Sequence, residues 1–298
     1  MNQLLDDLIK VMTLERLELD LFRGESRDIG SPQVFGGQVL GQALVAATAT
    51  VEERTVHSLH AYFLRRGDFN SPIVYEVDRA LDGKHFSSRR VVAIQHGRQI
   101  FNMSASFQLA ESGLDHQIPM PEVPFPESLP DVESHYRGMA DQLPPAARRM
   151  LEQKRPFEFR PVHPPDLLRQ DKSEPLKYIW FRAVDKLARD DEALHRCLLA
   201  YVSDYHLLDT ALRPHGISMI SPKLVIASID HAMWFHRSVR VDDWLLYVVD
   251  SPSASGARGF TRGSVFARDG RLVASAAQEG LIRVREDVRA GAEGAAPR

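Results

Sequence analysis

The stretch Leu198-Leu-Ala-Tyr-Val-Ser-Asp-Tyr-His-Leu-Leu-Asp-Thr210 decides how the rest of the chain is interpreted. Apolar residues recur at three- and four-residue steps here, which is the spacing of one face of an α-helix. The pattern predicts a helix from about Glu192 to Leu212. Asp204 lies inside it, and its helical neighbours three and four positions away are all uncharged. Because burying a carboxylate without partners is costly, we expect Asp204 to find polar partners elsewhere in the fold.

A helix followed by four strand-like stretches occurs twice in the chain. Each copy ends in a predicted hairpin, with the turn signals His96-Gly97 and Asp269-Gly270. Setting Gly97 against Gly270 also aligns Arg89 with Arg262. We infer an internal duplication, with two similar modules that meet at a pseudo-two-fold interface. The first copy has its helix from near Gly36 and strands at about 55–64, 72–78, 86–95 and 99–108; the second has strands at about 223–235, 244–249, 260–267 and 272–282.

Composition divides the chain into four parts. The N-terminal module covers residues 1–112, opening with a predicted helix at 1–15 and a short strand at 19–23. A linker at 113–176 carries twelve of the 18 prolines, and proline disfavours helix interiors and central strands. A helical piece is expected near 146–152, with strands beginning again at 157–161 and 177–182. The C-terminal module covers 177–285, and the charged, Ala/Gly-rich tail 286–298 is predicted to be disordered.

The length and composition of the whole chain are those of an ordinary globular protein. The 298 residues are 44% hydrophobic and 26% charged, with a formal charge of −3, so no strong field favours nucleic acid. Cys197 is the single cysteine, which excludes an internal disulfide, and we expect it to be buried. The sequence starts without a secretory signal, contains no membrane-spanning apolar run and ends without a Ser-Lys-Leu address. We therefore expect a cytoplasmic protein that does not bind a membrane.

Two glycines on the first helix indicate a close approach. Gly37 and Gly41 lie four residues apart, on one face, and each costs about 1 kcal/mol relative to alanine inside a helix. This face would allow another backbone to approach closely, so the two glycines indicate either a packing or a ligand role, although the spacing matches neither a dinucleotide-binding nor a P-loop motif.

Ser228 and Gln278 are candidate polar partners on predicted strands. Both faces of the strand around Ser228 are apolar, which predicts a central, buried strand, and no G-x-S-x-G surrounds the serine. Gln278 lies on a face of small apolar residues, where its amide must find partners and has groups able to bind a water or a carbonyl. Each residue also has a purely structural interpretation: a serine bonded to a nearby carbonyl, a glutamine satisfied by backbone groups, and for Asp204 a carboxylate that fixes local structure.

The histidines and arginines give weaker signals. Twelve histidines are present, but no H-E-x-x-H motif and no cysteine pair accompanies them, so we expect no metal and no cofactor. The arginines at 65, 66, 89, 90, 258 and 262 have the chemistry to meet a phosphate-bearing ligand, although a solvated rim is the commoner role.

Four motifs resemble the acyl-CoA thioesterase II family. They are Phe35-Gly-Gly-Gln-Val, His57-Ser-Leu-His-Ala-Tyr-Phe-Leu-Arg65, Ile229-Asp-His-Ala-Met-Trp-Phe-His236 and Gln278-Glu-Gly280. The resemblance implies an α+β double hotdog, two repeated modules each with a long helix wrapped by an antiparallel sheet. It implies a fatty acyl-CoA substrate, a homo-oligomer (dimer or tetramer), a cytosolic or peroxisomal location and no metal. It also implies a catalytic trio of Asp204, Ser228 and Gln278, with serine where bacterial members often have threonine.

The mechanism expected from this resemblance is hydrolysis of the thioester by direct attack of water. Asp204 is expected to act as general base while Ser228 and Gln278 fix the water. Ala105 is the counterpart of Gln278 in the first module, so no second site is expected there. Three alternatives remain at this point: a hotdog enoyl-CoA hydratase or dehydratase pairing Asp204 with His206 or His231, a non-enzymatic acyl-CoA-binding module, and a structural protein without a ligand.

Overall fold

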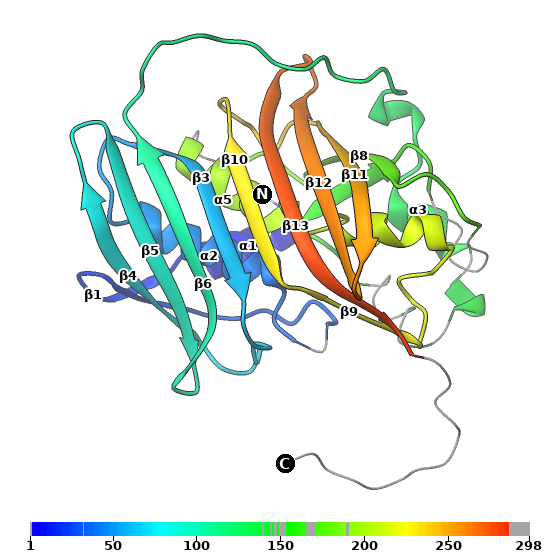
Figure 1. The fold of residues 1–298 in the computed structure, drawn as a ribbon, viewed down its shortest axis with the longest axis horizontal. Helices are drawn as coiled ribbons and strands as arrows, with labels where there is room; N and C mark the ends of the chain where they lie inside the picture. Colours follow the sequence, from blue (N-terminus) through cyan, green and yellow to red (C-terminus); the bar gives the residue numbers. More distant parts are fainter. Residues whose placement is uncertain are drawn as a thin grey trace, which may run out of the picture.

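One continuous antiparallel sheet runs through the whole molecule (Figure 1). The structure, a computed structural model, describes residues 2–285 apart from 32, 139, 144, 146, 147, 149–152, 165–170, 189 and 190. The helices α1, α2 and α5 lie together against one face of the sheet. The helical bounds are α1 Gln3–Met12, α2 Gly36–Thr48, η1 Pro126–Ser128, α3 Val132–Arg137, η2 Ala140–Gln142, α5 Glu192–Ser203 and η3 Leu208–His215. The strands are β1 Glu15–Glu18, β2 Leu21–Gly24, β3 Thr55–Phe63, β4 Ile73–Asp82, β5 Phe86–Gln95, β6 Arg98–Gln108, β7 Phe157–Pro161, β8 Leu176–Ala183, β9 Leu224–Ser228, β10 Asp230–Phe235, β11 Leu245–Ser255, β12 Arg258–Ala267 and β13 Leu272–Val284.

The order of the strands reveals the duplication. Counted outward from the contact between β3 and β10, the first half reads β3, β6, β5, β4, β2, β1 and the second reads β10, β13, β12, β11, β8, β7. The two orders correspond strand for strand. Both predicted hairpin turns are present, with Gly97 at φ 70° and Gly270 at φ 91°, conformations that glycine adopts without strain. The expected repeat of a helix and an antiparallel sheet is therefore confirmed, whereas the proposed boundaries of its modules and linker remain an interpretation.

The helices α2 and α5 pack against each other more closely than most helices can. A Cβ on Gly37 would overlap the carbonyl oxygen of Tyr201, and one on Gly41 would lie 3.2 Å from the carbonyl oxygen of Cys197. The expectation of a close backbone approach is thus confirmed, and the approaching backbone is that of α5. Because these contacts pair the start of α2 with the end of α5, the two helices run antiparallel.

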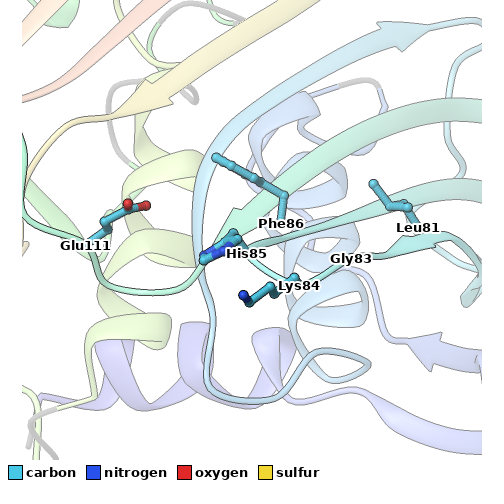
Figure 2. A pocket seen from close by; sticks show the side chains of 6 residues that line it. All are labelled: Leu81, Gly83, Lys84, His85, Phe86 and Glu111. Atoms are coloured by element: carbon cyan, nitrogen blue, oxygen red, sulfur yellow. The ribbon is translucent and has the colours of Figure 1, made fainter.

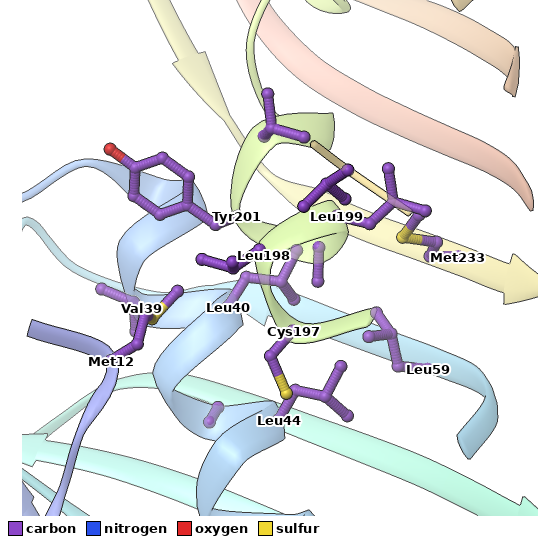
Figure 3. Close-up of a cluster of buried hydrophobic side chains, with 14 of the residues drawn as sticks. Met12, Val39, Leu40, Leu44, Leu59, Cys197, Leu198, Leu199, Tyr201 and Met233 are labelled. Atoms are coloured by element: carbon purple, nitrogen blue, oxygen red, sulfur yellow. The ribbon is translucent and has the colours of Figure 1, made fainter. Parts of the chain in front are cut away.

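A core of fully buried aliphatic and aromatic side chains surrounds this helix pair (Figure 3). Leu40 and Leu44 of α2 and Leu198 and Leu199 of α5 are completely buried, each contributing about 1.5–3 kcal/mol by its removal from water. Cys197 is also buried as expected, and burial raises the pKa of its thiol to about 12, so the thiol stays protonated and unreactive.

The prediction of one helix from Glu192 to Leu212 is wrong. Helix α5 ends at Ser203, Asp204 is its C-cap residue, and His206 takes a left-handed conformation with φ 60° before η3 begins. The apolar periodicity continues through the break because both helical segments bury side chains against the same sheet. With no glycine or proline at the turn, the sequence carried no conventional stop signal.

The prediction that Ser228 lies on a central, buried strand is also wrong. Strand β9 pairs with β13 and, among the described strands, with no other, and its residues are all partly exposed. Ala232 pairs with Ala277, and Ser228 pairs with Gly280. The β9–β10 side therefore spans four residue steps where β13 spans three, and its extra residue is Ile229. Strands β9 and β10 are therefore one path broken by a β-bulge, a feature that re-aims the side chains beside it.

The proline-rich segment lies over the second half of the sheet. Met120, Val123 and Leu129 pack on a small cluster that contains Trp180 and Trp244, and Trp180 donates a hydrogen bond to the carbonyl of Pro124 at 3.0 Å. Strands β7 and β8 match the predicted strand starts. The helical piece expected near 146–152 falls almost wholly outside the described residues, as does the tail 286–298. Among the described helices, none has the length and apolar content needed to cross a membrane.

Candidate active site

Asp204, Ser228 and Gln278, which are far apart in sequence, meet at the end of α5. The side-chain nitrogen Nε2 of Gln278 donates to Oδ1 of Asp204 at 2.7 Å and to Oγ of Ser228 at 3.1 Å. Gln278 is completely buried on β13, while Asp204 and Ser228 are partly exposed. The structure thus brings all three candidates together, with the glutamine amide between the acid and the alcohol.

Two irregular features of the backbone bring the side chains of Asp204 and Ser228 to the site. Asp204 points away from the helix axis because α5 stops there and the chain turns through Tyr205 and His206. Ser228 is the last residue before the bulge at Ile229, whose N–H donates to the carbonyl of Glu279 on the neighbouring strand. Both features lie in the connection between α5 and β10, which is far longer than its counterpart between α2 and β3 in the first half. The C-cap residue of α2, which corresponds in position to Asp204, is Ala49, and Ala105 on β6 stands where the sequence alignment sets Gln278, so neither position carries a polar side chain.

The orientation of the Gln278 amide is fixed by its neighbours. If the amide were rotated, its oxygen would face the carboxylate of Asp204, and two acceptors would meet without a hydrogen between them. In the observed orientation the oxygen Oε1 is buried and accepts no hydrogen bond from the described residues. An acceptor in that state is costly unless a small polar molecule donates to it.

The N-terminus of α2 closes the other side of the site. A Cβ on Gly36 would lie 2.7 Å from Oδ2 of Asp204 and 3.0 Å from the ring of Phe63. Phe35, the N-cap residue of α2, provides no side-chain hydrogen bond to the first turn. The backbone N–H groups at the start of α2, together with the positive end of the helix dipole, therefore lie beside the carboxylate.

Aromatic rings line the region next to Asp204. The ring centroid of Phe35 lies 4.3 Å from that of Tyr205 and 5.2 Å from that of Tyr201, and the two tyrosine hydroxyls are 3.3 Å apart. Burial raises the pKa of both tyrosines, so both remain neutral phenols at physiological pH. These rings form an apolar surface at the sequence neighbours of Asp204 and Gly36.

His231 belongs to the same cluster, although the sequence suggested it only as the partner of Asp204 in a dehydratase. It lies fully buried on β10, with Nδ1 3.4 Å from Nε2 of Gln278 and Nε2 3.0 Å from Oγ of Ser203. Strand alternation in the segment from Ile229 to Phe235 places it on the same face as Met233, which was the available signal. His206, the other histidine suggested, contacts the ring of Phe159 instead.

Other candidate features lie away from this cluster. A surface hollow of about 370 Å³ lies around the β4–β5 turn and is lined by Leu81, Gly83, Lys84, His85, Phe86 and Glu111 (Figure 2). Of the arginines considered for phosphate binding, Arg89 is buried against Thr50 and Asp82, and Arg262 pairs with Asp250. Among the described residues, no three histidine, cysteine or acidic side chains group as metal ligands would.

Comparison with known proteins identifies the family of the chain. A family model described as acyl-CoA thioesterase matches residues 147–281, and one described as the acyl-CoA thioesterase N-terminal domain matches residues 23–108. Acyl-CoA thioesterase 2 of Haemophilus influenzae is 41% identical over 96% of this chain and 100% of its own length. Human acyl-coenzyme A thioesterase 8 is 44% identical over 93% of this chain and 89% of its own length.

Solved structures show the same fold. The acyl-CoA thioesterase II TesB2 of Mycobacterium marinum superposes with a TM-score of 0.75 at 40% identity, covering 93% of this chain and 98% of that one. A protein from Alicyclobacillus acidocaldarius described as having a hot dog fold superposes with a TM-score of 0.73 at 18% identity, covering 94% and 99%. The α+β double hotdog expected from the sequence is thus confirmed.

Proposed function

Since this chain belongs to the acyl-CoA thioesterase family and hydrolyses acyl-CoA thioesters, we propose that it does so by direct attack of a water molecule, with Asp204 as general base. The observation that carries the proposal is the junction at Gln278, whose Nε2 contacts both Asp204 and Ser228. In this proposal the carboxylate, the hydroxyl and the amide oxygen of these three residues bind one water molecule. That set suits the binding of a water molecule whose hydrogens both need acceptors.

In this proposal the water is held by its two hydrogens. One is donated to Asp204 and the other to the buried Oε1 of Gln278, which accepts no bond from the described residues. The lone pairs of the water then point away from both groups and toward the carbonyl carbon of the thioester. Ser228 accepts from Gln278, so its own proton is free to be donated within the site. Holding the water in this way supplies catalysis by positioning.

The reaction then proceeds in two steps. Asp204 accepts a proton as the water oxygen bonds to the carbonyl carbon, which produces a tetrahedral oxyanion. The carbon–sulfur bond breaks as the carbonyl re-forms, and CoA leaves as a thiolate that later takes up a proton. A thiolate leaves readily compared with an amine, so the site needs no strong general acid at the sulfur.

We further propose that the first-turn N–H groups of α2 bind the oxyanion. Gly36 and Gly37 begin this helix, and Gly36 lies beside the Asp204 carboxylate. Helix N-termini direct unpaired N–H groups and a partial positive charge toward a bound anion. The general base would then come from the second half of the chain and the oxyanion donors from the first.

A labelling experiment tests direct attack by water. In isotopically heavy water, many turnovers on one acyl-CoA should place the heavy oxygen in the released acid and leave the peptide containing Asp204 unlabelled by mass spectrometry. Label in the Asp204 carboxylate would show that Asp204 attacks the thioester itself, and the general-base proposal would be withdrawn. Thiol release measured over acyl-CoAs of graded length, with the Asp204→Asn variant alongside, gives the chain-length preference.

The other functions considered from the sequence are less well supported. A hydratase would need an acid–base pair spanning the α- and β-carbons, but His231 faces Ser203 and Gln278. Loss of the conjugated double bond of an enoyl-CoA, followed by its absorbance, would reveal that activity if present. A binding protein without catalysis would retain acyl-CoA and release no free thiol.

We also propose that the protein acts on fatty acyl-CoA in the cytoplasm as a homo-oligomer, either a dimer or a tetramer. The exposed aromatics Tyr62 on β3 and Trp234 on β10, 54% and 37% accessible, support association through the outer face of the sheet. Light scattering at several concentrations, repeated with Trp234→Lys, tests the assembly. Cell fractionation tests the location, which rests on the sequence expectations alone.

A further inference from the structure

Gln278 has more hydrogen-bond partners than it has hydrogens to give. Its amide nitrogen lies within hydrogen-bond distance of Asp204, Ser228 and the Nδ1 atom of His231, but an NH2 group carries two hydrogens. The contact to His231, at 3.4 Å, is the longest of the three. What His231 presents at Nδ1, a lone pair or a hydrogen, therefore decides how the amide is held.

Ser203 determines which nitrogen of His231 carries the hydrogen. The Ser203 hydroxyl lies 2.9 Å from the carbonyl oxygen of Ala200, which can only accept, and 3.0 Å from Nε2 of His231. When the hydroxyl donates to Ala200, its oxygen is left to accept from an Nε2–H of His231. The opposite tautomer would set an Nδ1–H against the NH2 of Gln278, so this is the one neutral assignment in which no contact sets two donors against each other.

Ser203 is itself held firmly in place. It is the last residue of α5, it is 1% exposed, and its carbonyl oxygen accepts a hydrogen bond from the Tyr247 hydroxyl at 3.1 Å. The ring of Tyr247 occupies space that a side chain at Gly263 would fill. A continuous chain of buried hydrogen bonds thus runs from the end of α5 through Ser203 and His231 to Gln278.

We propose that His231, held as the Nε2–H tautomer by Ser203, is a positioning residue that orients Gln278. One hydrogen of the Gln278 amide goes to Asp204, and Ser228 and His231 share the other. By accepting its share, His231 keeps Nε2 turned toward Asp204 and Oε1 turned toward the attacking water. His231 does not touch the substrate and exchanges no proton with it. This inference rests on the role proposed above for Gln278.

The surroundings of His231 keep it neutral. Burial lowers the pKa of the imidazole, and the nearby negative charge of Asp204 acts in the opposite direction. A neutral ring is required, because a protonated His231 would direct hydrogens at both Ser203 and Gln278. Buried networks of this kind are stable when every member is satisfied, and here each member of the chain has a partner.

The test is a double-mutant cycle between His231 and Gln278, measured by thiol release. His231→Leu should lower kcat about 10- to 100-fold with little change in KM, because the water is misplaced while the acyl-CoA is still bound. In the Gln278→Ala background the same change should alter the residual kcat less than about twofold, because nothing remains for His231 to orient. His236→Leu is the matched control, since His236 also pairs with a serine, Ser275, but lies away from Gln278.

Three further measurements keep the test decisive if His231→Leu folds poorly. Ser203→Ala leaves the imidazole in place and should lower kcat in the same way, and His231→Asn should recover part of the activity because its amide oxygen can take the place of Nδ1. Nitrogen NMR of histidine-labelled protein should show the hydrogen of His231 on Nε2.

The outcomes separate this inference from the proposed function. Full activity in Gln278→Ala would overturn the role of Gln278 and this inference together. If Gln278→Ala has a reduced kcat but His231→Leu and Ser203→Ala both have a normal kcat, the positioning role of His231 is overturned and the role of Gln278 stands. An undiminished effect of His231→Leu in the Gln278→Ala background would also overturn the positioning role, because that pattern indicates a general structural role.

Discussion

The carboxylate of Asp204 lies against the first turn of α2, so close to Gly36 that a methyl group there would be 2.7 Å from Oδ2. Helix α2 belongs to the first half of the chain and Asp204 to the second. The contact therefore joins the two halves at the point where the chemistry is proposed to occur.

Gly36→Ala should lower kcat by about 100-fold with a small effect on stability, because the added methyl displaces the general base from the water. Thiol release under saturating acyl-CoA measures kcat, and thermal unfolding measures stability. Gly113→Ala is the control, since a methyl group there meets nothing within 4 Å. Unchanged turnover in Gly36→Ala would show that the space between Asp204 and α2 is not needed for the reaction.

Asp204→Asn should lower kcat by about 100-fold or more while the protein folds normally, because an amide cannot accept the proton from water. Turnover by thiol release and the midpoint of urea unfolding are the two measurements. Asp230→Asn serves as the neighbouring control, because that carboxylate accepts a backbone N–H from Glu279 and stands outside the hydrogen bonds of Gln278. The general-base role is ruled out if Asp204→Asn turns over at a near-normal rate.

Ser228→Ala should reduce kcat by about tenfold or more, whereas Ser228→Thr should stay within a few-fold of the wild type, because threonine keeps the hydroxyl that meets Gln278. Ser228 is partly exposed at the end of β9, so the extra methyl of threonine has room. Steady-state kinetics on one acyl-CoA compare the two variants. Equal losses in both would mean that shape, and not the hydroxyl, matters at this position.

His206 should make the protein less stable as the pH falls below about 6.5. Burial, with a further effect from Lys177, lowers the pKa of its imidazole to about 3 in the folded chain, while the unfolded chain binds a proton near 6.5. The unfolded state then holds more protons in this range, so the free energy of unfolding decreases by roughly 1.4 kcal/mol between pH 7.5 and pH 5.5. Urea unfolding at the two pH values measures it.

His206→Asn is the variant that isolates this effect, because asparagine tolerates the left-handed conformation at φ 60° and does not titrate. The decrease in stability between the two pH values should be smaller in this variant, with a remainder from other histidines such as His231. An identical pH dependence in variant and wild type would exclude His206 as its source.

The sequence was most informative where regular patterns and glycines carry the fold. Alternation and turn residues located both hairpins, and Gly37 with Gly41 indicated the close approach of α2 and α5. The resemblance to a family then selected Asp204, Ser228 and Gln278, whose side chains do meet in space.

The errors fall at the two irregular features of the site. Periodicity extended the helix past Ser203 because the apolar face continues beyond the turn, and alternation passed over the extra residue Ile229. Neither turn nor bulge contains glycine or proline, so local sequence carried no signal. Ser203 was not predicted, and His231 was considered only as a dehydratase partner of Asp204, because each resembles an ordinary buried residue until its hydrogen-bond partners are known.

The long connection between α5 and β10 has no counterpart of similar length in the first half, so the proposed active centre occurs once per polypeptide and not once per repeat. Two identical halves would have carried two equivalent centres, but here one copy supplies the acid and the other the opposing helix end. If the proposed site is correct, separating the halves at the β3–β10 pairing would remove activity even with every side chain intact. Specialisation of the copies has made each half dependent on the other.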